Sequence, residues 1–72
     1  GPTAAALVFI CLDPGLSIGE LAVRIRLSHA GTVRLIDRLE LERLVERRRN
    51  DSDRRARFIY LTTSGEELMA AI

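Results

Sequence analysis

The chain has 72 residues, enough for one domain with a marginal core, because a chain of this length buries only about 60% of the surface that its unfolded form exposes. Its 47% hydrophobic and 29% charged residues are typical of a globular soluble domain, and the lack of an apolar run of about 18 residues excludes a membrane-spanning helix. The net charge of +1 hides an asymmetry, since the stretch 24–57 holds all eleven basic residues, every one an arginine, against six acidic residues. That stretch therefore carries +5 and the rest −4, which favours a polyanionic partner or, alternatively, a solvated surface with intrahelical ion pairs.

The first predicted element is an apolar helix near the N-terminus. Gly1-Pro2 resembles a protease-cleavage scar and no signal peptide is visible, so we expect the domain to span residues 3–72. The run TAAALVFICLD predicts a helix with a possible N-cap at Thr3 and an end at Asp13-Pro14-Gly15. Because this helix is apolar on nearly every side, we expect it to pack between other elements. Cys11, the only cysteine, is then expected to be a buried small hydrophobe, and a single thiol fits the cytoplasm.

Two short helices with a tight connection follow. Ser17 and Glu20 have the spacing of a capping box, which predicts the start of a second helix, and the preceding LSI could add a short edge strand. After a gap of a few residues around Arg26-Leu27, Ser28 caps a third helix, HAGTVRLIDRLELE. This arrangement is a helix-turn-helix pattern, although many such corners have nothing to do with DNA.

The third helix has two distinct faces when its residues are placed at about 100° each. The core-facing set is Thr32, Leu35, Ile36 and Leu39, and the outward set is Ala30, Val33, Arg34, Asp37 and, at its margin, Arg38. An exposed valine alone needs no explanation. A small apolar group beside an arginine, however, offers contacts for a thymine methyl and for guanine O6 and N7 in a major groove.

From Leu44 the hydrophobic period changes to that of a strand. The runs LVERRR and RFIYLT flank NDSDRRA, which predicts a hairpin with a long arginine-bearing tip. Val45, with Phe58, Tyr60 or their neighbours, would cover the core. Thr62 or Thr63 then caps a last helix, SGEELMAAI, which has no stop signal and is interpreted as truncated.

This order of elements predicts a mainly α fold with a small β-sheet (α+β), a winged helix-turn-helix with a two-stranded wing. The sequence resembles the MarR family (multiple antibiotic resistance regulators) of bacterial transcription factors. The resemblance is carried by GLSIGELAVRIRLSHAGTVRLIDRLE, by LVERRRNDSDRRARFIYLT and by the wing pattern Asp53, Arg55, Leu61 and Thr62, over about residues 15–68.

The resemblance implies a sequence-specific regulator that binds double-stranded DNA, with the third helix in the major groove and the wing in or beside the minor groove. It implies recognition-helix contacts from Ser28, His29, Ala30, Val33 and Arg34, with Arg38 at the margin of the same face. In the wing it implies that Arg55, braced by Asp53, enters the groove and that Arg54 and Arg57 lie near phosphates.

Two features depart from the family pattern. Arg43 stands where family members usually place the glycine that ends the third helix, so the helix either ends without an αL glycine or strains one residue. The family builds its dimer from helices before and after this segment, and here these are absent or truncated. The resemblance implies a homodimer for the full-length protein, in which these helices would be present. It does not identify a small-molecule effector.

Other functions find less support. His29 is the only histidine and no carboxylate cluster has metal-ligand spacing, so we expect no catalytic residue, no metal and no cofactor. The main alternative is a winged-helix protein–protein interaction module without DNA binding, which would usually lack arginines such as Arg34 and Arg38 on its third helix. A further alternative is an isolated lobe that binds DNA weakly, because one half-site lacks the avidity of two.

Overall fold

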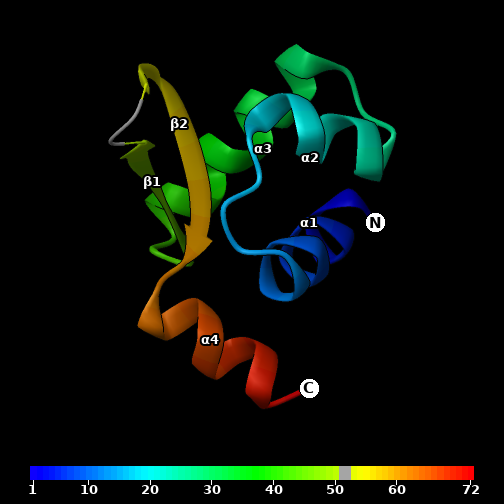
Figure 1. The fold of residues 1–72 in the computed structure, drawn as a ribbon. Coiled ribbons are helices and arrows are strands. Elements are labelled where there is room, and N and C mark those ends of the chain that lie inside the picture. The colour runs from blue at the N-terminus through cyan, green and yellow to red at the C-terminus, as the bar shows by residue number, and fades with distance from the viewer. Residues whose placement is uncertain (51–52) are drawn as a thin grey trace.

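The fold is a winged helix-turn-helix, as predicted. The computed structural model describes residues 1–50 and 53–72, and the side chains of residues 1–49 and 58–72. The elements are α1 (Pro2–Leu12), α2 (Ile18–Ile25), α3 (His29–Leu41), β1 (Val45–Asn50), β2 (Asp53–Leu61) and α4 (Thr63–Ala70). In Figure 1 the first three helices lie together on one side, the β1–β2 wing stands beside α3, and α4 extends from the base of the wing.

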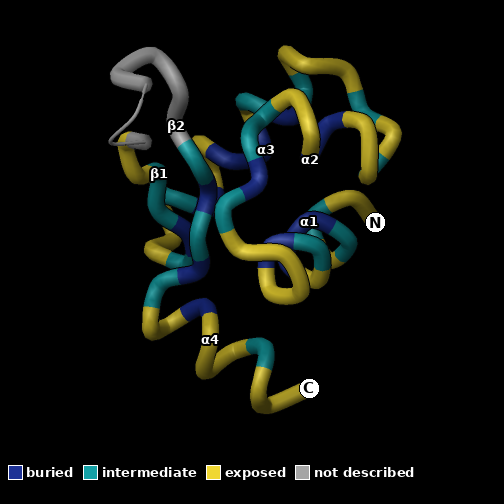
Figure 2. Tube along the Cα trace, in the orientation of Figure 1, coloured by how far each residue is buried: buried dark blue, intermediate teal, exposed yellow. Residues whose placement is uncertain are grey.

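One hydrophobic core joins the three N-terminal helices to the wing. Figure 2 shows the buried positions on the inner sides of these elements, whereas α4 is mostly exposed. The core residues are Ala6, Leu7, Ile10, Leu16, Leu21, Leu35, Ile36, Leu39, Val45, Ile59 and Leu61. The predicted core face of α3 is confirmed, because Thr32, Leu35, Ile36 and Leu39 are all buried.

Two expectations for α1 were wrong. The helix begins at Pro2 with Gly1 as its N-cap residue, so Thr3 lies inside it, because proline is well suited to the first helical position. Cys11 is exposed, since α1 buries only the stripe of Ala6, Leu7 and Ile10. Nearly uniform apolarity gave no signal for which side of the helix would face the core. The predicted end of the helix is confirmed, with Asp13 as its C-cap.

The predicted N-caps of the other helices are confirmed. Ser17 Oγ accepts from the Glu20 amide at 3.1 Å, and Glu20 Oε1 accepts from the Ser17 amide at 3.2 Å, which completes the capping box of α2. The hydroxyl of Ser28 caps α3, and that of Thr62 caps α4. The short edge strand predicted before α2 is a single antiparallel bridge between Leu16 and Ile59.

Both α2 and α3 end at an arginine in the left-handed conformation. Arg26 has φ 56° and Arg43 has φ 62°. After α3, the Leu44 amide donates to the Leu39 carbonyl at 2.9 Å and the Arg43 amide donates to the Glu40 carbonyl at 2.9 Å, which is a Schellman motif. Of the two possibilities for Arg43, the chain therefore adopts the strained one.

The wing pairs in a register that decides which strand residues reach the core. Val45 lies opposite Leu61 and Arg47 lies opposite Ile59. Ile59 and Leu61 are consequently buried, while Phe58 and Tyr60 are only partly buried, so the neighbours of the two aromatic residues complete the core. The strands are longer than expected, since β1 runs to Asn50 and β2 starts at Asp53 with an irregularity after Arg49.

The start of α4 lies very close to the connection between α3 and β1. Thr62 Oγ1 donates to the Arg43 carbonyl at 2.6 Å and accepts from the Gly65 amide at 3.0 Å. A Cβ on Gly65 would lie 2.1 Å from the Leu44 carbonyl oxygen, so only glycine fits there.

Among the helices in the described ranges, none has the length and apolarity needed to cross a bilayer.

Candidate nucleic-acid interface

The outward face of α3 is accessible over most of its length. Ala30, Arg34, Asp37 and Arg38 are exposed and Val33 is half-buried, in agreement with the predicted face. Arg34 and Arg38 are one turn apart and border the same shallow groove, whose other wall includes Pro2 at the start of α1. This side of α3 can therefore contact a partner, or fit into a groove of the partner, without rearrangement of the core.

The N-terminus of α3 is held by two local hydrogen bonds. Ser28 Oγ accepts from the Gly31 amide at 3.0 Å, and the buried Thr32 hydroxyl donates to the Ser28 carbonyl at 2.8 Å. Ser28, His29 and Ala30 remain exposed around this end. The partial positive charge of a helix N-terminus suits a phosphate, and two of these residues carry donors that can reach one.

The arginines whose side chains are described divide into those with and those without an ion pair to a described carboxylate. Arg24 contacts Asp13 at 2.8 Å, Arg47 contacts Asp37 and Glu40, and Arg48 contacts Glu46. Exposed arginines without an ion pair to any carboxylate of the described side chains are Arg26, Arg34, Arg38, Arg43 and Arg49. Cationic side chains that are not neutralised within the protein are available to an anionic partner.

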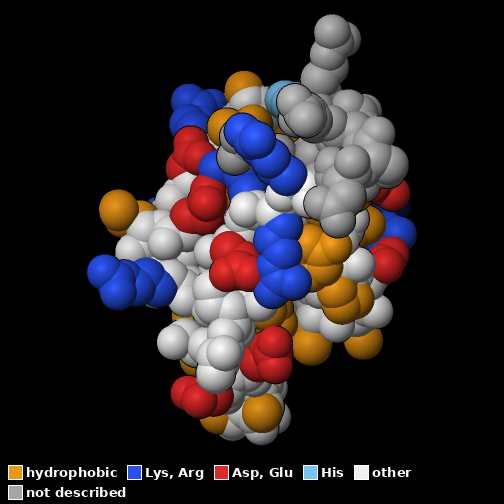
Figure 3. Space-filling view, turned by 60° about the vertical axis from the view of Figure 1, so that its left-hand side comes forward, with side chains coloured by type: hydrophobic (Ala, Val, Ile, Leu, Met, Phe, Trp, Pro, Cys, Tyr) orange, Lys and Arg blue, Asp and Glu red, His pale blue; other side chains and the backbone are white. Residues whose placement is uncertain are grey.

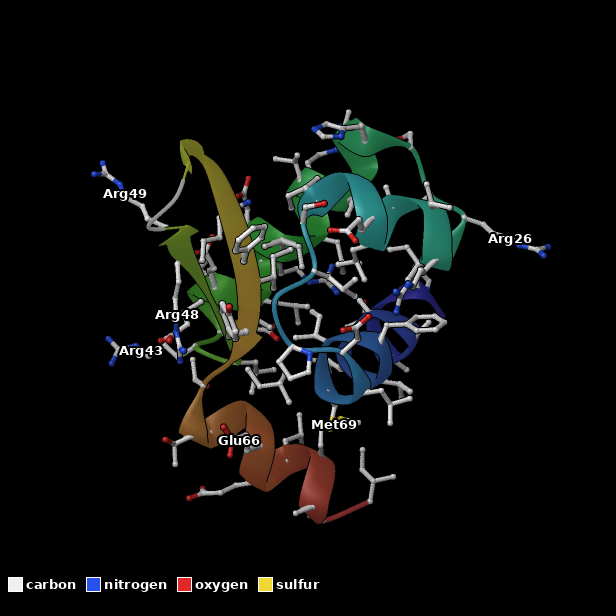
Figure 4. The ribbon with its side chains drawn as sticks, in the orientation of Figure 1. Arg26, Arg43, Arg48, Arg49, Glu66 and Met69 are labelled. Atoms are coloured by element: carbon white, nitrogen blue, oxygen red, sulfur yellow. The ribbon has the colours of Figure 1, made fainter. Side chains whose placement is uncertain are left out.

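Three of these arginines, Arg26, Arg43 and Arg49, were not predicted as contact residues. Arg43 is the left-handed residue that follows α3. Arg26 lies in the turn between α2 and α3, and Arg49 lies near the end of β1. Figure 4 shows both side chains extending away from the body of the molecule, on opposite sides. The position of Arg26 in the short connection between the two helices could have been identified from the sequence. The register that places Arg49 opposite Arg57, in contrast, is known only from the fold.

The predicted wing contacts lie outside the described side chains. The backbone of β2 includes all four of these residues, Asp53, Arg54, Arg55 and Arg57. The expectation of a long tip that contains Arg54 and Arg55 was therefore wrong. Arginine is tolerated in strands, and the ladder extends further than the turn-forming residues suggested. Their roles toward DNA stay predictions.

The α3 N-terminus and the far end of the wing lie toward the same end of the molecule. In Figure 1 both are at the upper side of the view, and α4 is at the lower side. On the face shown in Figure 3, basic side chains lie near the histidine at the upper end, while the lower end carries acidic side chains of α4. The charge asymmetry of the sequence is thus a polarity of the folded molecule.

A cavity of about 530 Å³ lies between the end of α1, the wing and the end of α4. Cys11, Tyr60 and Met69 are among the residues that line it. Within the described part of the chain, no group of three or more His, Cys, Asp or Glu side chains could hold a metal ion.

Comparisons with known proteins identify the relatives of this chain. The model of the MarR family matches residues 1–56. The HTH-type transcriptional regulator BilQ of Clostridium symbiosum is 33% identical over 61 residues, which cover 85% of this chain and 42% of BilQ. The chain thus spans less than half the length of this relative.

Solved structures agree with the fold in detail. A variant of S. aureus MepR bound to an oligodeoxyribonucleotide is 26% identical, with a TM-score of 0.92 over 99% of this chain and 53% of that one. The transcriptional repressor CouR, bound to a 23-mer DNA duplex, is 30% identical, with a TM-score of 0.87 over 93% of this chain and 47% of CouR. By its family-model match and its relatives, this chain belongs to the MarR family.

Proposed function

We propose that this chain is the DNA-binding lobe of a bacterial transcriptional regulator that binds double-stranded DNA sequence-specifically. The observation that carries the proposal is the exposed outward face of α3, where Arg34 and Arg38 form no ion pair with any carboxylate of the described side chains. The N-terminus of this helix lies at the same end of the molecule as the far end of the wing (Figure 1). An α-helix fits the width of the major groove, and a two-stranded ribbon beside it can reach the adjacent minor groove. A MepR variant bound to an oligodeoxyribonucleotide and CouR bound to a 23-mer DNA duplex share this fold, which supports DNA binding by this lobe.

In this arrangement the residues divide into base-reading and backbone-contacting groups. Val33 and Arg34 face the base edges, and Ser28, His29 and Ala30 lie at the helix end that approaches the backbone. Arg38 borders the same face. In the wing, Arg55 with Asp53 serves the minor groove, and Arg54 and Arg57 serve the phosphates. Contacts to phosphates position the lobe, whereas contacts to base edges select the sequence.

The full-length protein is proposed to be a cytoplasmic homodimer that binds two half-sites. A two-fold operator matches a two-fold dimer, and two linked contacts raise the overall affinity well above that of one lobe. A protein-binding winged helix is less favoured, because Arg34 and Arg38 are exposed where such modules usually carry an apolar patch. The family relatives are transcriptional regulators, in line with the expectation that the chain is not an enzyme.

The proposal is tested by selection of bound duplexes from a random pool, followed by a salt titration of the enriched sequence. We expect one enriched motif, and an affinity that falls steeply with salt because phosphate contacts release counterions. Absence of an enriched motif, or an affinity that is insensitive to salt, would favour a protein partner instead.

A further inference from the structure

Arg47 is an arginine of the wing whose side chain turns toward α3. It lies on β1 opposite the buried Ile59, on the strand face that covers the core, and its side chain is only 21% exposed. Its guanidinium donates to Asp37 at 2.9 Å and also to Glu40. This side chain therefore joins the wing to two carboxylates of α3.

These two carboxylates lie in an unfavourable place for a DNA-binding surface. Asp37 and Glu40 are one turn apart on α3, and Asp37 belongs to the same outward face as Arg34. Asp37 is 58% exposed and Glu40 is 34% exposed. A negative charge on the face that approaches the phosphates opposes association, since like charges across an interface are strongly unfavourable.

From this geometry we infer that Arg47 is a positioning residue for DNA binding, which shields Asp37 and Glu40 from the phosphates. The inference rests on the proposed function and extends it to a residue that does not itself reach the DNA. One guanidinium with five donors satisfies both carboxylates and leaves little of its own charge exposed. The face of α3 then presents the charge of Arg34 and Arg38 without two uncompensated acids beside it.

Arg48 provides a matched control on the same strand. Its side chain lies on the other face of the wing, where it contacts Glu46 and stacks over the Tyr60 ring at 4.3 Å from the centroid. Arg48→Met removes the same charge and nearly the same volume as Arg47→Met. It leaves Asp37 and Glu40 paired with Arg47.

The test measures the affinity of the chain for its selected duplex at low salt. We expect Arg47→Met to weaken binding by about tenfold and Arg48→Met to weaken it by much less. Arg47→Lys should keep most of the affinity, because it retains the positive charge next to the carboxylates. The decisive variant is Arg47→Met combined with Asp37→Asn and Glu40→Gln, which we expect to regain most of the lost affinity.

Each outcome has a clear meaning. Thermal unfolding of all variants, monitored by circular dichroism, confirms that each is folded under the conditions of the binding assay. A variant that is less stable but still folded under these conditions should keep its affinity unless the binding surface itself has changed. If the combined variant binds as weakly as Arg47→Met, or if Arg47→Met binds as well as the wild type, the shielding role is overturned. If the wild-type chain itself binds no duplex, the proposed function fails and this inference fails with it.

Discussion

Arg34 is the residue on which sequence readout is proposed to depend most. It is exposed on α3, close to the half-buried Val33, and it has no ion pair to a carboxylate among the described side chains. An arginine can donate two parallel hydrogen bonds to guanine O6 and N7, a geometry that no other base pair offers in the same way. The positive charge of Arg34 thus contributes to the affinity for any DNA, whereas its position on the helix contributes to the selectivity for one base pair.

We expect Arg34→Ala to relax the preference for one base pair by about 1–3 kcal/mol, because the bidentate contact to that base is lost. The measurement is a competition among duplexes that differ at single positions of the selected motif. Arg54→Ala is the matched control, since a contact to a phosphate should be lost to a similar extent on every sequence. An equal loss on all duplexes for Arg34→Ala would contradict its assignment to a base edge.

At the scale of the elements, helix ends show how local strain is tolerated. Arg43 occupies the left-handed position of the Schellman motif after α3, with φ 62°. A residue with a side chain costs about 1–2 kcal/mol more than glycine in this conformation. Substitution by glycine recovers only part of this energy, because glycine has more conformational freedom in the unfolded chain. The helix nevertheless ends there, because Leu44 and Val45 must turn into the wing.

Arg43→Gly should therefore stabilise the chain by about 0.5–1 kcal/mol. The free energy of unfolding from urea denaturation measures this effect. As a control, Arg38→Gly places the same substitution inside α3, where it should destabilise by about 1 kcal/mol. A loss of stability in Arg43→Gly would show that the arginine side chain contributes more than its backbone strain costs.

The junction of α4 with the wing gives a second prediction at this scale. Gly65→Ala places a Cβ 2.1 Å from the Leu44 carbonyl oxygen, so α4 must shift and the cap by Thr62 is disturbed. We expect a loss of about 1–3 kcal/mol in the free energy of unfolding.

Gly19→Ala is the matched control for this substitution. Its Cβ would meet only Ser17 Oγ at 4.0 Å, on an exposed position of α2, and alanine should stabilise the helix by about 0.5–1 kcal/mol. Equal effects of the two glycine substitutions on urea denaturation would show that the close approach to Leu44 is unimportant.

For the whole molecule, the distribution of charge matters more than the net charge of +1. The arginines lie in the helix-turn-helix and the wing, and the last fifteen residues carry only the acidic Glu66 and Glu67. Such a polarity orients the lobe as it approaches a polyanion and raises the rate of productive encounters. It also predicts that affinity is governed by the ionic strength.

We expect the logarithm of the association constant to fall linearly with the logarithm of salt concentration, with a slope of about −0.9 for each phosphate contact. Arg54→Ala and Arg55→Ala should each weaken binding across sequences and reduce that slope by about 1. Arg24→Ala is the control, because Arg24 is paired with Asp13 and stacks near Phe9. An unchanged slope in both wing variants would contradict the contact of these two arginines with DNA.

The amino-acid sequence alone determined the elements and their order. Helix starts depend on local groups, so Ser17, Ser28 and Thr62 could be identified as caps without knowledge of the fold. The periodicity of α3 likewise separated its core face from its exposed face, because a helix with one polar side can pack in only one orientation.

Only the tertiary structure decided which side of each ambiguous element is buried. The apolar α1 carried no directional signal, so the exposure of Cys11 followed from what α2, β2 and α4 cover. The wing offered two alternating faces, and the register that pairs Val45 with Leu61 chose Ile59 over Phe58 and Tyr60. The contact of Arg47 with Asp37 and Glu40 joins a strand to a helix, and such non-local pairs depend on how whole elements pack.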